Sequence, residues 1–175
     1  MRDGDARAVV RWPVIVETAA LFLMYALGLV AAWLVWPPLS LLYLVLILSC
    51  NLLFMARICP YCRHFEARSC HSGYHHLARF FRRREGRTFA QEFQRNVAVM
   101  YPVWAFPPLA AIYGLIRDLP AGLNWGLLTA VMLFCVAGFV VLPLASRRIC
   151  AGCANAAECP RGARRDTVAP VGSPD

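Results

Sequence analysis

The sequence predicts an all-α membrane protein with four transmembrane helices. Hydrophobic residues make up 59% of the 175 residues and charged residues 16%, whereas charged residues make up about 25% of a soluble domain. Four apolar runs each approach the roughly 20 residues that a helix needs to cross the hydrocarbon core of a bilayer. The predicted spans are residues 14–36, 39–56, 97–116 and 123–145.

The first two spans are predicted to form a tight helical hairpin. The first span is longer than the apolar region of about 7 to 15 residues in a signal peptide, and no clear small-residue cleavage site follows it. We therefore interpret it as a retained helix. Pro37 and Pro38 separate it from the second span and deny the backbone a helical continuation.

The loop at residues 63–96 is basic and has no core of its own. Aromatic and leucine side chains recur at helical spacing among its arginines, which predicts two short interfacial helices with the aromatic side in the headgroup region. The apolar positions are Tyr74, Leu77 and Phe81 in the first helix, and Phe89 and Phe93 in the second.

The third and fourth spans form a second predicted hairpin, turned by residues 117–122. Three prolines in the third span remove backbone donors, so we expect a kinked or broken helix in which other groups satisfy the freed carbonyls. Small residues in the fourth span permit close helix contact. The prolines are Pro102, Pro107 and Pro108, and the small residues are Gly126, Ala130, Ala137 and Gly138.

The arginines predict the orientation in the membrane. All eighteen basic residues are arginine, the net charge is +8, and seventeen of the arginines lie before the first span, between spans two and three, or after span four. By the positive-inside rule, both termini and the central loop are cytoplasmic. We expect a multi-pass protein of the bacterial inner membrane that contacts anionic lipid headgroups, and no nucleic acid.

A cysteine knuckle occurs twice. RICPYC at residues 57–62 is nearly repeated as RICAGC at residues 148–153, and each copy follows a predicted hairpin and precedes a third cysteine. An even number of crossings points both copies the same way, which predicts two tandem hairpins related by a pseudo-twofold axis, with both knuckles on the cytoplasmic face. The predicted divisions are residues 1–62, 63–96, 97–162 and a disordered tail at 163–175.

The knuckles favour metal ligation. A C-x-x-C turn presents two thiolates to one ion or cluster, and two such turns complete four ligands. An iron-sulfur cluster is favoured over zinc for two reasons. A single four-thiolate zinc site leaves the third cysteine of each copy, Cys70 and Cys159, unexplained. Cys159 is also followed by proline, as is the last ligand in some ferredoxin runs. The candidate metal ligands are Cys59, Cys62, Cys70, Cys150, Cys153, Cys159 and His71.

Two other chemistries remain open for these cysteines. CPYC matches the active-site tetrapeptide of glutaredoxins, but here it follows a membrane helix and lacks the βαβ setting of that motif. Structural disulfides are disfavoured on a cytoplasmic face, and a thiol relay to a quinone would require the opposite orientation. Cys50 and Cys135 lie inside spans and are predicted to be packing residues.

The sequence thus predicts a small membrane protein that binds an iron-sulfur cluster or zinc, as an electron-transfer subunit or accessory factor of a membrane redox system. A protein docked on the cytoplasmic face and a membrane quinone are the expected partners. The alternatives are a zinc-stapled scaffold and a thiol-disulfide relay. No catalytic residue is identified, so enzymatic activity stays open. Glu17, the only carboxylate in a span, is expected near the cytoplasmic interface.

Overall fold

The computed structural model describes residues 3–62, 80–81 and 86–151, and these residues form helices and turns without a strand. Four helices are long and apolar enough to cross a membrane, which confirms the predicted all-α class and the number of spans. These candidate spans are Val14–Val35, Pro37–Tyr61, Phe89–Ala121 and Trp125–Ile149.

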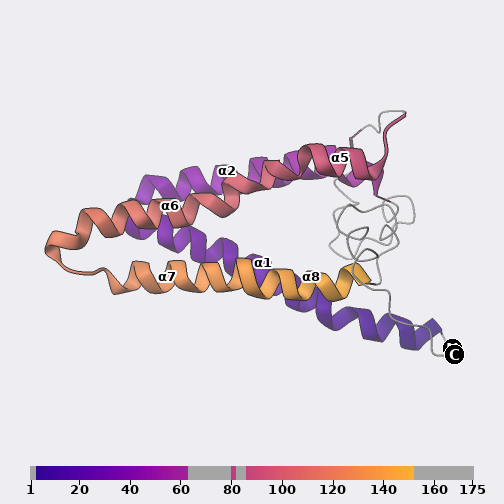
Figure 1. Cartoon of the computed structure of the whole chain (residues 1–175), viewed down its shortest axis with the longest axis horizontal. Helices are drawn as coiled ribbons and strands as arrows, with labels where there is room; N and C mark the ends of the chain where they lie inside the picture. Colours follow the sequence, from indigo (N-terminus) through magenta and orange to yellow (C-terminus); the bar gives the residue numbers. More distant parts are fainter. Residues whose placement is uncertain (1–2, 63–79, 82–85, 152–175) are drawn as a thin grey trace, which may run out of the picture.

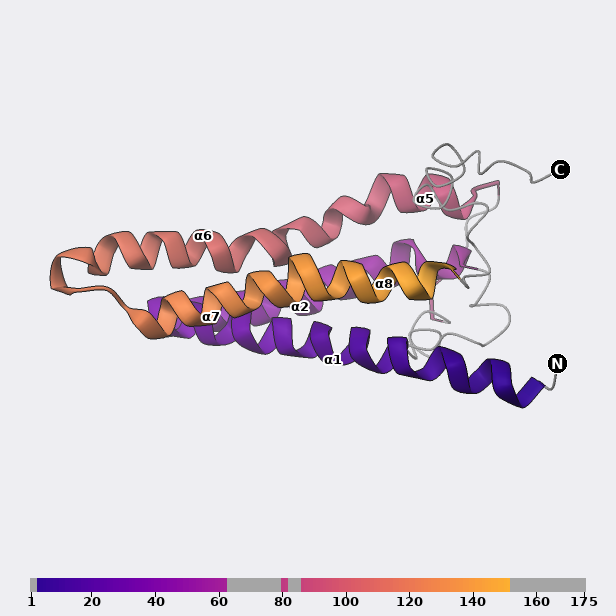
Figure 2. The ribbon, with the colours of Figure 1, turned by 60° about the horizontal axis from the view of Figure 1, so that its bottom comes forward.

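The long helices lie side by side as an antiparallel bundle (Figures 1 and 2). At the end that we call the knuckle end, α1 begins and α2 and α8 finish; the other end, with Trp36 and η3, is the turn end. The elements in chain order are α1 (Asp3–Val35), α2 (Pro37–Arg57), η1 (Cys59–Tyr61), α5 (Phe89–Asn96), η2 (Val97–Met100), α6 (Tyr101–Asp118), η3 (Leu119–Ala121), α7 (Trp125–Cys135), the π-helical turn η4 (Val136–Val141) and α8 (Leu142–Ala151).

Local capping explains why two helices begin at other residues than predicted. Helix α2 starts at Pro37 and leaves Trp36 alone between the first two helices, because the first helical position needs no N–H donor and suits proline. Helix α7 starts at Trp125, because the Asn124 side chain accepts a hydrogen bond of 3.1 Å from the Leu127 N–H.

The third long helix begins well before residue 97. The segment predicted as the second interfacial helix forms α5, which starts at a capping box made by Thr88 and Gln91 and continues through η2 into α6 (Figure 2). The rings of Phe89 and Phe93 lie 5.6 Å apart on α5. Most of the first predicted interfacial helix lies outside the described residues.

Helix α6 passes through its internal prolines without a break. Pro107 has no N–H, so the carbonyl of Val103, four residues earlier, loses its helical partner. The Tyr43 hydroxyl of α2 donates to that carbonyl oxygen at 3.1 Å, and the Tyr43 ring stacks on Phe106 with centroids 5.4 Å apart. The expectation that another helix satisfies a carbonyl freed by proline is confirmed at this position.

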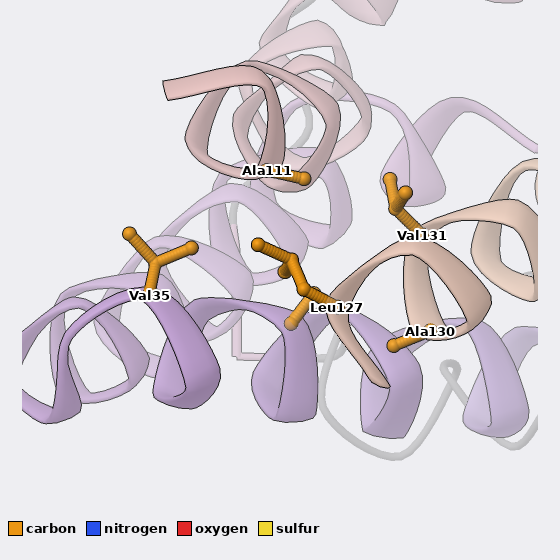
Figure 3. Packing of buried hydrophobic residues seen from close by; sticks show 6 residues of the cluster. Val35, Ala111, Leu127, Ala130 and Val131 are labelled. Atoms are coloured by element: carbon orange, nitrogen blue, oxygen red, sulfur yellow. The ribbon is translucent and has the colours of Figure 1, made fainter. Parts of the chain in front are cut away.

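Near the turn end, α1, α6 and α7 meet in a buried aliphatic cluster that includes Val35, Ala111, Leu127, Ala130 and Val131 (Figure 3).

A glycine allows this approach of three helices. A Cβ atom on Gly114 would lie 2.7 Å from a methyl carbon of Val35 and 2.9 Å from one of Leu127. Of the small residues in the fourth helix that could permit close contact, Ala130, Ala137 and Gly138 are buried, whereas Gly126 is exposed.

Arg117, the one arginine between the third and fourth spans, caps the C-terminal end of α1. Its Nη1 donates to the Val35 carbonyl oxygen at 3.0 Å, and its Nε donates to Asp118 at 2.7 Å. The carbonyls at the end of α1 carry the negative pole of the helix dipole, and the prolines that follow cannot donate to them. Arg117 supplies both the positive charge and a donor there.

The packing is unequal between the two halves of the chain. Helix α1 is central and packs against α2, α6, α7, η4 and α8, whereas α6 packs against α1, α7 and α2. At the knuckle end α8 packs mainly on α1, while α5 and η2 pack on α2. A pseudo-twofold axis between the two hairpins would make α1 and α6 equivalent, and each would then have matching neighbours. Their neighbours differ, so this packing does not confirm the predicted axis.

Candidate metal centre

The first knuckle is a tight turn attached directly to the end of α2. The Ile58 N–H donates to the Phe54 carbonyl at 2.9 Å and the Cys62 N–H donates to the Cys59 carbonyl at 3.1 Å, which closes the 3₁₀ turn Cys59–Tyr61. Main-chain hydrogen bonds therefore hold Cys59 and Cys62 on one short turn.

The apolar residues of this turn are buried and its cysteines are not. Ile58 is 3% exposed and Tyr61 7% exposed, Pro60 is fully buried, and both cysteines are half-buried. The turn is therefore anchored in the protein by its apolar side chains, while its two cysteines are only partly covered.

The structure places the other candidate ligands only in part. Cys150 lies in the last turn of α8 at the knuckle end, the same end as Cys59 and Cys62 (Figures 1 and 2). Its side chain is outside the described part, as are the whole of Cys70, His71, Cys153 and Cys159. Among residues 3–62, 80–81 and 86–151, no three or more Cys, His, Asp or Glu side chains gather as a metal site. Two candidate ligands, Cys59 and Cys62, are thus brought together within this part.

A charged cluster beside the knuckle was not predicted. Glu92 of α5 is the buried charged residue of the described segments, 4% exposed, and it forms a salt bridge with Arg87. The Asn96 side chain donates to the Glu92 carboxylate at 2.8 Å and to its backbone carbonyl at 2.9 Å. We call Arg87, Glu92 and Asn96 the carboxylate clamp.

The carboxylate clamp borders the CPYC turn. Helix α5 packs against α2, and Arg87 is close enough to the Tyr61 hydroxyl to interact with it electrostatically. The hydrogen bond and the charge of Glu92 raise the pKa of the Arg87 guanidinium above its ordinary value, so this group stays charged. The sequence signal that could have found the clamp is the spacing of four between Glu92 and Asn96, which places both on one helix face.

Loss of the clamp should loosen the knuckle. In Glu92→Gln the negative charge that holds Arg87 beside the CPYC turn is lost. We therefore expect this turn to open more often, and Cys59 and Cys62 to react several-fold faster with a thiol reagent. The measurement is the alkylation rate in a background with Cys50 and Cys135 replaced by alanine, followed by mass spectrometry of the peptide that carries the turn.

A matched control for this variant lies on the same helix. Gln94 is exposed on α5, and Gln94→Ala should leave the alkylation rate unchanged. An equal rate in Glu92→Gln and the unsubstituted protein would show that the clamp does not restrain the turn.

Glu17 has a partner on the fourth helix. The Ser146 hydroxyl of α8 donates to the Glu17 carboxylate at 2.6 Å. Glu17 is half-buried and lies five positions after the exposed Trp12, or about 7 Å further along the helix. The bond joins α1 to α8 close to the knuckle end.

The cysteines inside the spans are packing residues in this structure. Cys50 is 6% exposed in the cluster around Tyr43, and Cys135 packs against two clusters that involve α1 and α7. Both are free thiols.

No family model, curated protein or solved structure matches this chain.

Proposed function

We propose that this chain is a multi-pass protein of the bacterial inner membrane that binds a metal centre through its two cysteine knuckles, as an electron-transfer subunit or accessory factor of a membrane redox system. The observation that carries the proposal is the CPYC turn, in which Pro60 and Tyr61 are buried while Cys59 and Cys62 are half-buried on one turn. A turn anchored in this way holds two thiols on one short stretch of backbone, and thiolates are the ligands that a soft metal prefers.

The donor set fits a thiolate-bound centre. Cys59 and Cys62 would supply two thiolates, and Cys150 and Cys153 of the second knuckle two more, with Cys70, Cys159 and His71 as the ligands of a second centre. An iron-sulfur cluster, when bound, supplies one-electron transfer. The protein's own contribution is to hold the thiolates at the membrane surface, and neighbouring arginines favour the more negative, reduced form of such a centre.

The proposed topology is two tandem hairpins with both knuckles on the cytoplasmic face. Support comes from the arginines of the described segments. Four exposed arginines lie on helices near the knuckle end: Arg57, Arg95, Arg147 and Arg148. Near the turn end, Arg117 is bonded to the last turn of α1. By the positive-inside rule the knuckle end is then cytoplasmic. We propose that anionic lipid headgroups and a soluble protein partner contact these arginines, and that a membrane quinone is a second redox partner.

The metal can be tested directly. Protein purified without oxygen is expected to contain iron and sulfide. It should also absorb at about 400 nm, as thiolate-bound iron-sulfur clusters do. Cys59→Ser with Cys62→Ser should remove the absorbance, because two of four ligands are lost. The control is Cys50→Ser with Cys135→Ser, which should retain it, since those thiols pack inside the bundle.

Three results would contradict an iron-sulfur centre held by the knuckles. Zinc at one ion per chain without iron would select the zinc-stapled scaffold. Cysteine-dependent thiol exchange without metal, with knuckles that an impermeant thiol reagent reaches from the periplasm, would select the thiol relay. Metal that remains after both knuckles are substituted would place the ligands elsewhere.

A further inference from the structure

A polar contact ties α1 to the end of α8 that leads into the second knuckle. The Ser146 hydroxyl donates to the Glu17 carboxylate at 2.6 Å, within the range of about 2.5 to 2.7 Å for a hydroxyl that donates to a charged oxygen. Both side chains are half-buried. An ionisable group within a membrane span is costly, so Glu17 has a role that an apolar packing residue at this position would not fill.

Apolar contacts continue from this pair toward the middle of the bundle. Leu142, four positions before Ser146 on α8, belongs to the same buried cluster as Ala20 and Met24 of α1. Ala20 and Met24 follow Glu17 along α1, so the two helices run antiparallel with their contacts in matching order. The Glu17–Ser146 pair lies on the knuckle side of the apolar contacts and fixes the register of the two helices there.

The backbone fixes the direction of α8 less firmly than a regular helix would. The Leu142 N–H donates to the Ala137 carbonyl oxygen five residues earlier, as in a π-helix. Pro143 follows directly and has no N–H to donate. Helices bend sharply at prolines and at π-helical turns, and both occur where α7 passes into α8. The contacts of α8 with α1 therefore determine where its far end lies.

Cys150 lies one turn beyond Ser146 on the same face of α8. The spacing of four positions gives this placement, and it corresponds to about 6 Å along the helix axis. Helix α8 ends at Ala151, so the bond to Glu17 is made little more than one turn before the chain leaves the helix. Where Ser146 is held therefore decides where the backbone of Cys150 lies.

We infer that Glu17 is a positioning residue for the second knuckle: through Ser146 it holds the end of α8, and with it Cys150, in one place relative to α1. The first knuckle lies at the same end of the bundle (Figures 1 and 2). The ligands of a metal centre have to be held within roughly 0.5 Å of their working geometry, and residues behind the ligands provide this support. This role rests on the proposed function, because it consists of presenting one knuckle to the other.

Hydrogen exchange measures the hold on α8 without any metal. In the metal-free full chain in nanodiscs, the amide exchange of residues 147–151 is followed by mass spectrometry. Ser146→Ala is expected to raise the exchange rate of this segment roughly tenfold, because a hydrogen bond to a charged group is lost. Glu17→Ala should have the same effect. The double substitution should add little to either, because both single substitutions remove the same bond.

Milder variants and matched controls separate the hydrogen bond from a general loss of packing. Ser146→Thr keeps the hydroxyl and should keep the slow exchange. Glu17→Gln keeps an acceptor oxygen without the charge, so its increase should be smaller, about threefold. Thr18→Val and Ser49→Ala change exposed residues of α1 and α2 and should leave the exchange of residues 147–151 unchanged.

The retention of iron supplies the functional measurement. After reconstitution with ferrous iron and sulfide, Ser146→Ala and Glu17→Ala should lose iron to a chelator several-fold faster than the unsubstituted protein, whereas Ser146→Thr should lose it at the unsubstituted rate. A ligand that is held loosely dissociates more often, so the two measurements should change together across the variants.

Unchanged exchange in both Ser146→Ala and Glu17→Ala overturns the inference. Faster exchange with an unchanged loss of iron overturns it as well, because α8 would then be held without consequence for the metal. If the unsubstituted protein takes up no metal, the proposed function is refuted, and the exchange rates still decide whether Glu17 holds the end of α8.

Discussion

Gly28→Ala is expected to destabilise the bundle by about 2 to 3 kcal/mol, the upper part of the range for overpacking a core. A Cβ atom on Gly28 would lie 2.5 Å from the Cε1 of Tyr43, 2.8 Å from its Cζ and 2.7 Å from its hydroxyl oxygen. Distances this short require a displacement of the ring or of the helix that carries Gly28.

Tyr43 has little freedom to move. It is fully buried, its hydroxyl is bonded to the Val103 carbonyl, and its ring stacks on Phe106 at an interplanar angle of 8°. Displacement of the ring would break the hydrogen bond, so the substitution would either separate α1 from α2 or leave the Val103 carbonyl without its donor. Either change has a free-energy cost in addition to the clash.

The measurement is the free energy of unfolding in mixed detergent micelles, followed by circular dichroism. Gly126→Ala is the matched control, because the nearest atom to its new Cβ would be 3.6 Å away, an ordinary contact. Alanine also has the higher helix propensity by up to about 1 kcal/mol, so this control should be neutral or stabilising. Equal stability of Gly28→Ala and Gly126→Ala would contradict the proposed role of Gly28.

The number and approximate places of the spans were predictable because the bilayer imposes length and apolarity on each helix separately. Those requirements are local in the chain, so composition is enough to find them. The first residues of α2 and α7 were less predictable. A proline at the start of α2 and an asparagine before α7 can each either interrupt a helix or begin one, and the sequence does not decide between the two. Pro37 and Asn124 both start helices here.

Contacts between helices could not be read from the sequence. Gly28 stands between two leucines of an apolar run, and nothing in that run shows that the Tyr43 ring lies against it. The same limit applies to the site. The spacing of Cys59 and Cys62 predicted a turn with two thiols. Glu92 lies thirty positions after Cys62, in α5, and becomes a neighbour of that turn only through the return of the third helix.

The freed carbonyl of Val103 leads to a second large expected effect. Tyr43→Phe should cost about 1 to 3 kcal/mol of unfolding free energy, because a buried carbonyl loses its donor in a region without water. Tyr113→Phe, on an exposed tyrosine of α6, should cost far less. The comparison separates the lost hydrogen bond from a general effect of removing a hydroxyl group.

A double-mutant cycle with Pro107 tests the cause. Pro107→Ala restores an N–H four residues after Val103, which can donate to the same carbonyl as in an ordinary α-helix. In that background the loss of the Tyr43 hydroxyl leaves no acceptor unsatisfied, so Tyr43→Phe should cost at least 1 kcal/mol less than it does beside Pro107. Any change in packing caused by Pro107→Ala alone is present on both arms of the cycle and cancels. An equal cost of Tyr43→Phe in both backgrounds would mean that the hydroxyl does not replace the donor that proline removes.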